Sequence, residues 1–206
     1  KKIFKNKKLK SNLIQIKKSK KILFLNKIKN KYFKSDGNIE NLLFAYKIVK
    51  KLKIKDEIII KAVNNFKGLA HRQEKVLSNK KFVCINDSKA TSFDASLQSL
   101  SNYDNIYWIV GGLPKRHDRF NLKKVKKNIV KAYIIGNNIS FFKKQINRNI
   151  KYQISKNIKS ALAHIYQDFR LDKNKKKTIL LSPSAASFDQ FKNFESRGNY
   201  FKNLAI

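Results

Sequence analysis

The chain of 206 residues contains no methionine, one cysteine, two prolines and one tryptophan. With Cys84 as its single cysteine, the chain cannot form an internal disulfide, which excludes a disulfide framework and favours a reducing compartment. Because an initiator methionine is missing, we expect the sequence to be a fragment of a longer protein.

Long apolar runs are also missing. None approaches the roughly 20 residues that a membrane span needs, and the charged stretch Lys1–Lys10 is not followed by the apolar stretch of a signal peptide. Apolar residues nevertheless make up 42% of the chain, enough for a real core, so extended disorder is not expected. The length allows one ordinary domain, or one domain plus a piece of another.

Arginine is scarce although the chain is strongly basic. Lysine and arginine number 48 against 13 acidic residues, a net charge of +35, but six of the 48 are arginine and 42 are lysine. Such a charge suggests a nucleic-acid-binding module. However, arginine is the residue best suited to bidentate base and phosphate contacts, and asparagine (23) and isoleucine (25) are abundant as well, as in AT-rich coding sequences. A lysine-rich solvated surface is therefore the favoured interpretation.

The first third of the chain predicts a hairpin followed by two helices. Alternating apolar residues in Leu13–Ile16 and Ile22–Leu25 predict a β-hairpin within residues 1–36. A helix beginning near Asn38 and a second over Asp56–Phe66 follow. Gly68 ends the second helix, and we expect a domain boundary near residue 70.

From residue 81 onward, short apolar runs alternate with helical segments. Continuous runs of this kind are typical of strands buried on both faces, and they lie at Phe82–Ile85, Ile106–Val110, Ala132–Ile135 and Thr178–Leu181. Helices are predicted at Phe93–Leu100, Leu122–Val130, Ile139–Ile146, Asn157–Phe169 and Phe188–Leu204, the last broken near Gly198. The alternation predicts an α/β fold with a Rossmann-like, mostly parallel sheet flanked by helices.

Polar or glycine-bearing turns follow each predicted strand, and ligands of open α/β sheets bind at that edge. The candidate residues there are Asp87, Ser88, Lys89, Thr91, Lys115 and the loop Ser182–Ser187. Cations and hydroxyls without a His/Cys cluster suit a carboxylate or phosphate better than a transition metal. Neither a G-x-x-x-x-G-K-[ST] loop nor a G-x-G-x-x-G motif is present.

Structural roles compete with these functional interpretations. Asp87 could cap the following helix, Gly111-Gly112 could be only a tight turn, and Cys84 could be a core residue. His71-Arg72, with Glu74 close behind, could form an ion pair between domains as readily as a ligand contact.

Five ordered motifs together are more specific than any of these residues alone. They are Gly68-Leu69-Ala70-His71-Arg72-Gln73-Glu74, Asn86-Asp87-Ser88-Lys89-Ala90-Thr91, Gly111-Gly112-Leu113-Pro114-Lys115, Ser182-Pro183-Ser184-Ala185-Ala186-Ser187-Phe188-Asp189-Gln190-Phe191 and Phe194-Glu195-Ser196-Arg197-Gly198. In order and spacing over residues 36–206, the chain resembles the Mur ligases, and within them the branch that adds D-glutamate.

The resemblance implies a domain organisation and a reaction. Residues 1–70 would be the tail of a central ATP-binding domain, and residues 71–206 a C-terminal Rossmann-like domain that receives the amino acid. The implied reaction is the ATP-dependent addition of D-glutamate to UDP-N-acetylmuramoyl-L-alanine through an acyl phosphate, in the peptidoglycan biosynthesis of the cytoplasm, by a monomer. The UDP-binding domain, the phosphate loop and the Mg²⁺-site lysine would lie upstream, so the chain alone should be inactive and hold no metal.

Residue roles are carried over from the motifs. Asn38 and Asn41 match a pair that contacts adenine, Arg72 resembles an arginine that reaches the nucleotide phosphates, and Asp87 resembles a ribose ligand. The implied D-glutamate pocket consists of Thr91, Lys115, Ser187, Phe194 and the backbone of Phe188.

The motifs depart from the family pattern at four positions. Gly37 replaces a histidine before Asn38, Ala70 a proline, Ser92 an asparagine and Ser184 a cysteine. None touches the implied glutamate contacts. A sister ligase with another amino acid, a non-catalytic homologue and the nucleic-acid-binding module remain as alternatives.

Overall fold

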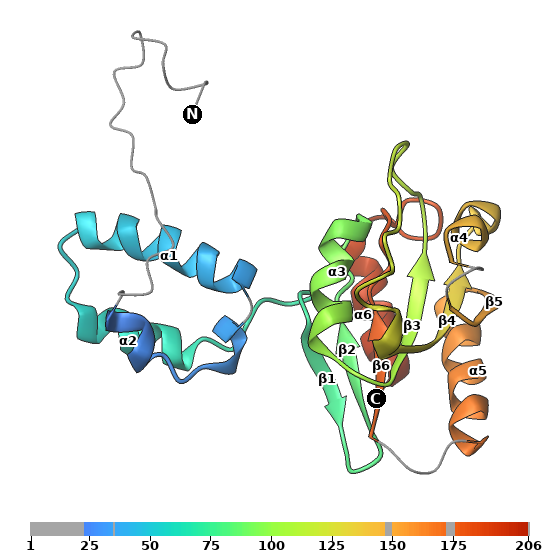
Figure 1. Cartoon of the computed structure of the whole chain (residues 1–206), viewed down its shortest axis with the longest axis horizontal. Coiled ribbons are helices and arrows are strands. Elements are labelled where there is room, and N and C mark those ends of the chain that lie inside the picture. The colour runs from blue at the N-terminus through green and yellow to red at the C-terminus, as the bar shows by residue number, and fades with distance from the viewer. Residues whose placement is uncertain (1–22, 35, 147–149, 172–175, 206) are drawn as a thin grey trace, which may run out of the picture. The chain divides into compact units, whose positions relative to one another are not determined.

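The computed structural model describes residues 23–34, 36–146, 150–171 and 176–205 (Figure 1). The chain divides into two compact units, Lys1–Lys67 and Gly68–Ile206. The division falls a few residues before the boundary predicted near residue 70. No helix in the described part of the chain is both long enough and apolar enough to cross a membrane.

The first unit is helical. It contains the 3-10 helices η2 (Leu23–Lys27) and η3 (Lys31–Lys34) and the helices α1 (Asp36–Lys51) and α2 (Asp56–Asn65), which agree with the two predicted helices. Phe24, Leu42 and Leu43 form its buried cluster. The predicted hairpin lies largely outside the described residues, and the part within them, Leu23–Lys27, is a 3-10 helix instead of a strand.

The second unit is built on one sheet of six strands. They are β1 (Glu74–Ser78), β2 (Phe82–Asn86), β3 (Ile106–Gly111), β4 (Ile129–Ile135), β5 (Tyr152–Lys156) and β6 (Lys177–Leu181). Their order across the sheet is β1-β2-β6-β3-β4-β5. Only β1 is antiparallel to its neighbour; the other pairs are parallel, as predicted.

Helices cover both faces of this sheet because its central strands are apolar on both sides. The helices are α3 (Phe93–Asn102), α4 (Ile139–Ile146), α5 (Ile158–Leu171) and α6 (Phe194–Ala205). Along β3, Ile106, Trp108 and Val110 pack in the core with α3 and α4, whereas Tyr107 and Ile109 pack with α5 and α6. The second unit is therefore a three-layer α/β/α arrangement (Figure 1).

Two of the predicted helices are corrected. Leu122–Val130 is not a helix: only Lys126–Asn128 forms a short 3-10 turn, η4, and Ile129 already begins β4. Leu122 and Val125 are buried at helix-like spacing, which explains the wrong prediction. The last helix begins at Phe194 instead of Phe188 and continues unbroken through Gly198.

The late start of α6 has a local cause. The amides of Gln190 and Phe191 both donate to the carbonyl of Ser187, which folds this stretch into a turn. Asn193 then caps the helix, because its Oδ1 accepts from the amide of Ser196 at 2.7 Å. The loop after β6 therefore extends from Ser182 to Asn193.

Candidate ligand site at the carboxyl edge of the sheet

Backbone hydrogen bonds join the turn after β3 to the loop after β6. The amide of Gly111 donates to the carbonyl of Pro183 at 2.9 Å. Leu113 and Ala186 exchange a pair of hydrogen bonds, at 2.8 and 3.0 Å, in an isolated antiparallel bridge. The two segments therefore lie side by side, as expected for segments that follow neighbouring parallel strands.

Close approach of backbones explains the two glycines of this turn. A Cβ on Gly112, which has φ +133°, would lie 2.3 Å from the carbonyl oxygen of Ala186. A Cβ on Gly111, with φ +140°, would lie 1.9 Å from the carbonyl oxygen of Ile135 in β4. The glycines thus do more than permit a tight turn: they let three segments of the edge meet.

The loop after β6 extends this edge to the ends of β4 and β5. Asp189 Oδ2 accepts from the amide of Asn137 at 3.0 Å, and Gln190 Nε2 donates to the carbonyl of Lys156 at 2.9 Å. Gly136, between these contacts, has φ +83°, a backbone conformation that favours glycine. The turns after β3, β4, β5 and β6 therefore form one connected rim.

Asp87, directly after β2, is buried in a cluster of hydroxyl groups. Its Oδ2 accepts from Ser99 Oγ at 2.7 Å and from Ser182 Oγ at 2.9 Å, and its Oδ1 accepts from the amide of Gln73 at 3.2 Å. Burial raises the pKa of Asp87 to about 6, although these hydrogen bonds and the nearby Arg72 act in the opposite direction. The carboxylate is thus held by the protein itself, with one lone pair of Oδ1 left over.

The interpretation of Asp87 as a helix cap is wrong. Ser92 is the N-cap of α3, and its side chain accepts from the amide of Ala95 at 3.4 Å. Asp118 Oδ2 accepts from the amide of Phe93 at 2.9 Å. Since these two side chains already serve the start of α3, Asp87 is available for another role.

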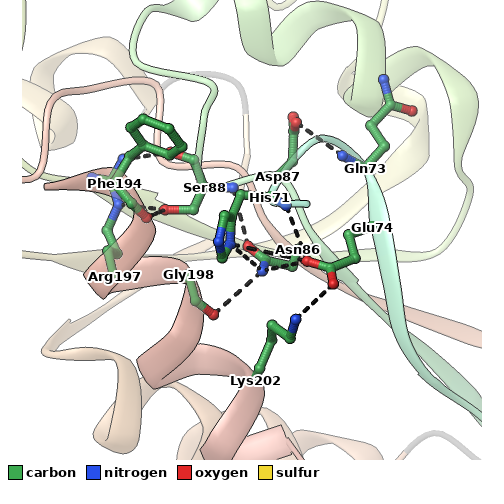
Figure 2. A network of polar contacts seen from close by, with 10 residues as sticks. All are labelled: His71, Gln73, Glu74, Asn86, Asp87, Ser88, Phe194, Arg197, Gly198 and Lys202. Atoms are coloured by element: carbon green, nitrogen blue, oxygen red, sulfur yellow. Dashed lines mark hydrogen bonds and ion pairs between the residues drawn. The ribbon is translucent and has the colours of Figure 1, made fainter. Parts of the chain in front are cut away.

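Asn86, the last residue of β2, is the centre of a second polar network (Figure 2). Its Nδ2 lies 3.0 Å from His71 Nδ1, 3.2 Å from Glu74 Oε2 and 3.3 Å from the carbonyl oxygen of Gly198. Lys202 Nζ donates to Glu74 Oε1 at 2.7 Å. Burial acts to raise the pKa of Glu74, but the hydrogen bonds from Lys202 and from the amide of His71 hold it below its ordinary value. The partner of Glu74 thus lies in the same unit, and the ion pair does not link two domains.

The residues predicted to receive D-glutamate all lie on segments that follow carboxyl ends of strands. Thr91 is half-buried just before α3, and Lys115 is exposed after β3. Ser187 is 2% exposed in the loop after β6, and its neighbour Phe188 is 69% exposed. The contact of the Phe188 backbone with D-glutamate remains a prediction.

Phe194, the fifth predicted residue, opens α6 against the turn after β2. Lys89 Nζ lies 3.7 Å from the centre of its ring, a cation–π contact. Ser88 Oγ donates to its carbonyl at 2.8 Å, and the His71 ring meets it edge-on at 6.0 Å (Figure 2). The start of α6 is thereby fixed beside β2.

The residues predicted to bind the nucleotide are divided between the two units. Asn38 and Asn41 belong to α1 of the first unit, where Asn38 Nδ2 donates to the carbonyl of Tyr32 at 2.7 Å and Asn41 is exposed. Arg72 and Asp87 belong to the second unit; Arg72 is exposed, whereas Asp87 is 6% exposed. The adenine role of the asparagines remains a prediction.

Arg197 is a buried cation that the sequence did not mark as a site residue. It is 1% exposed, and its guanidinium donates to Ser88 and to the carbonyl of Ala185. A Cβ on Gly112 would lie 3.3 Å from its Nη1. Its only signals in the sequence are the rarity of arginine and its place in the Phe194–Gly198 motif.

Curated proteins similar to this chain include several ligases of one name. The chain is 39% identical over 164 residues to the UDP-N-acetylmuramoylalanine–D-glutamate ligase of Rhizobium meliloti, covering 80% of this chain and 35% of the relative. It is 38% identical over 185 residues to the ligase of the same name in Mesorhizobium japonicum, covering 90% and 39%. The match to the Rickettsia felis ligase is 35% identical over 176 residues, covering 85% and 39%. The chain thus spans well under half the length of these relatives. No family model matches the chain.

Solved structures share the fold at low sequence identity. MurF from Acinetobacter baumannii superimposes with a TM-score of 0.57 at 13% identity, over 82% of this chain and 38% of that one. The UDP-N-acetylmuramate-alanine ligase MurC from Thermotoga maritima superimposes with a TM-score of 0.52 at 11% identity, over 82% and 37%. These structures support the fold that the sequence predicted.

Proposed function

This chain belongs to the Mur ligase family, and from that premise we propose that the protein carrying it joins D-glutamate to UDP-N-acetylmuramoyl-L-alanine at the expense of ATP, in peptidoglycan biosynthesis. The proposal is supported by relatives at 35–39% identity that are named as D-glutamate ligases. Because the chain spans 35–39% of their length, it accounts for only part of such an enzyme.

We assign the two units to two parts of that enzyme. Gly68–Ile206 would be the domain that receives the amino acid, and the helices of Lys1–Lys67 would belong to the end of the ATP-binding domain. The residues proposed for adenine, Asn38 and Asn41, lie in the first unit, and those proposed for D-glutamate lie in the second.

One observation carries the proposal: the connected rim at the carboxyl edge of the sheet. The bridge between Leu113 and Ala186 places the turn bearing Lys115 next to the loop bearing Ser187. A cation and hydroxyl donors on adjoining segments suit an amino acid with two carboxylates. Hydrogen bonds also join the backbones of the rim to one another and to Asp189, and a ligation site needs its groups held in position.

The proposed chemistry is attack of the D-glutamate amine on an activated carboxyl group of the other substrate. The amine, in its unprotonated form, makes the new C–N bond and then releases a proton to water, and phosphate leaves with the electrons of the broken C–O bond. In this scheme Lys115 binds one carboxylate of D-glutamate, and the hydroxyls of Thr91 and Ser187 donate to its oxygens. The backbone of Phe188 and the ring of Phe194 complete the pocket. These residues orient the amine instead of transferring protons, so their contribution is positional.

The residues of the second unit fit a nucleotide only in part. Arg72 is exposed and bears no ion pair in the described part of the chain, so its guanidinium can bind a phosphate group. Asp87 can offer a ribose hydroxyl only the remaining lone pair of Oδ1, because both of its oxygens already accept hydrogen bonds. The phosphate contact is therefore the better supported of the two.

Mg²⁺ enters the proposal only as the companion of ATP. In the described part of the chain, no group of three His, Cys, Asp or Glu side chains could hold a metal ion. No step of the proposed chemistry is therefore assigned to a metal ligand among these residues.

The test is a ligation assay on the protein as its gene encodes it, with any upstream sequence included. The purified protein receives UDP-N-acetylmuramoyl-L-alanine, ATP and Mg²⁺, and ADP release is followed with D-glutamate, L-glutamate or alanine. We expect ADP release that requires both the nucleotide sugar and D-glutamate. Release with another amino acid and none with D-glutamate would reassign the protein to a sister ligase, and no release with any of them would refute the enzyme proposal.

A further inference from the structure

Arg72 is exposed, but both of its neighbours have unusual backbone conformations. His71 has φ +60° and Gln73 has φ +47°, values in the left-handed region that residues other than glycine rarely adopt. Two such residues on either side of one arginine persist only where surrounding contacts determine them. The conformation of this segment therefore has to be explained by what holds its neighbours.

Hydrogen bonds fix the backbone on both sides of Arg72. The amide of His71 donates to Glu74 Oε2 at 3.0 Å, and its carbonyl accepts from the amide of Lys89 at 3.0 Å. The amide of Gln73 donates to Asp87 Oδ1 at 3.2 Å. Arg72 is thus held between a backbone tied to the turn after β2 and a carboxylate of the same turn.

The side chain of His71 packs between β2 and α6. The residue is 6% exposed, and a Cβ on Gly198 would lie 2.2 Å from its Nδ1, so the ring rests directly on the backbone of α6. Asn86 Oδ1 accepts from the amide of Ser88 at 3.2 Å, which turns the Asn86 NH₂ group toward His71. His71 Nδ1 is therefore the acceptor in its 3.0 Å contact with Asn86 Nδ2 (Figure 2).

Glu74, the first residue of β1, accepts the remaining hydrogen bonds of this network. It accepts from the His71 amide and from Asn86 with one oxygen, and from Lys202 of α6 with the other. The His71 ring is thereby enclosed by β2, by the start of β1 and by α6. On the α6 side the ring also meets the ring of Phe194, a residue proposed to touch D-glutamate, edge-on at 6.0 Å.

We propose that His71 is a positioning residue. Its buried ring packs on Gly198 and is hydrogen-bonded to Asn86, and these contacts fix the backbone conformation of Arg72. Arg72 is thereby positioned to bind an anionic group, the phosphates of the nucleotide. The assignment of that anion rests on the proposed function; the presetting of the Arg72 backbone does not. The effect of His71 on nucleotide binding therefore passes through Arg72.

The first test uses the 206-residue chain itself and needs no activity. In His71→Leu the ring nitrogen is lost, and amide hydrogen exchange at Arg72 and Lys89 should become at least about tenfold faster. His71→Asn, whose side-chain oxygen can accept from Asn86, should restore much of the protection. The matched control is His164→Leu, which removes the other histidine with a side-chain hydrogen bond, to Ser155, and should leave both amides unchanged.

The second test is a double-mutant cycle in the complete ligase. His71→Leu should raise KM for ATP about tenfold, and by more than it raises KM for D-glutamate, whose pocket His71 contacts through the ring of Phe194. In an Arg72→Ala background, the same change should add less than about a further twofold, because the two residues act as one.

The results separate the two proposals. Unchanged exchange at Arg72 and Lys89 in His71→Leu, or additive effects on KM for ATP, would overturn the positioning role. A wild-type ligase that is active, but not with D-glutamate, would refute the proposed substrate and leave both positioning tests in force with the true amino acid. A wild-type protein without any ligase activity would refute the proposed function, and the exchange measurement would then decide the presetting of Arg72.

Discussion

Arg197 holds Ser88 by two hydrogen bonds, from Nε to Oγ at 3.0 Å and from Nη2 to the carbonyl oxygen at 2.8 Å. The same Nη2 donates to the carbonyl of Ala185 at 3.0 Å, and Nη1 is buried without a hydrogen-bond partner among the described residues. Burial lowers the pKa of Arg197 to about 10, against the opposing charge of Asp189. One guanidinium on α6 thus ties the turn after β2 to the loop after β6.

Replacing Arg197 with lysine should destabilise the second unit. Lysine keeps the charge but has no planar fork, so it cannot reach the three acceptors together, and buried carbonyls lose their donors. We expect Arg197→Lys to lower the free energy of unfolding by about 3 kcal/mol. The single tryptophan of the chain, Trp108, is fully buried in this unit, so its fluorescence during urea unfolding reports the effect.

The control for this change is Arg170→Lys. Arg170 is exposed near the end of α5, and its replacement should alter stability by less than about 0.5 kcal/mol. Equal unfolding curves for the two variants would show that the guanidinium of Arg197 does not stabilise the rim.

Asp87 should make stability depend on pH. Its pKa is about 6 in the folded chain against an ordinary 3.8, because burial disfavours the charged form. A folded-state pKa above the unfolded one stabilises the fold fully below about pH 4, and this stabilisation is lost as the pH rises through about 6. At 1.36 kcal/mol per pKa unit, the loss is about 3 kcal/mol.

Asp87→Asn isolates this contribution. The amide cannot ionise, yet it can keep hydrogen bonds to Ser99, Ser182 and the Gln73 amide. Urea unfolding of both proteins at pH 4, 5, 6 and 7 should show the wild type losing stability relative to Asp87→Asn across that interval. A difference that stays constant with pH would contradict the raised pKa.

Gly111→Ala should disrupt the rim by a backbone collision. The new Cβ would lie 1.9 Å from the carbonyl oxygen of Ile135, and no rotamer change can relieve a contact between two backbones. We expect a loss of more than about 3 kcal/mol from the Trp108-reported transition. Gly37→Ala, at an exposed position in α1 of the other unit, should leave that transition unchanged. A small effect of Gly111→Ala would indicate that β3 and β4 do not approach so closely.

Lys115→Ala should weaken binding of the amino acid and little else. Loss of a charged donor to a carboxylate costs about 1.5–3 kcal/mol, so KM for D-glutamate should rise by roughly tenfold or more while KM for ATP stays within about twofold. Lys123→Ala, another exposed lysine downstream of β3, is the matched control. Unchanged kinetics in Lys115→Ala would remove this residue from the pocket.

The fold was predictable where burial left a simple pattern. Phe82–Ile85 and Ile106–Val110 are continuous apolar runs because β2 and β3 lie inside the sheet with helices on both sides. The strands Glu74–Ser78 and Tyr152–Lys156 occupy the two edges, where exposed polar positions interrupt the run, and both were missed. Sequence periodicity thus indicates the burial of a segment more directly than its secondary structure.

The site was predictable as a set of turns but not as a network. The order of strands and helices located Asp87, Lys115 and Ser187 at one edge. It could not pair His71 with Asn86, 15 residues apart, or Arg197 with Ser88, 109 residues apart. Such pairs depend on how α6 packs against β2, which no local pattern encodes.

The proposed specificity for D-glutamate can be tested by competition of amino acids for the same activated substrate. The complete protein, with UDP-N-acetylmuramoyl-L-alanine, ATP and Mg²⁺, is offered equal concentrations of D-glutamate, L-glutamate, alanine and D-alanyl-D-alanine, and the products are identified by mass spectrometry after chiral analysis. We expect D-glutamate to be the amino acid incorporated. A product that carries alanine, D-alanyl-D-alanine or L-glutamate in its place would contradict this expectation.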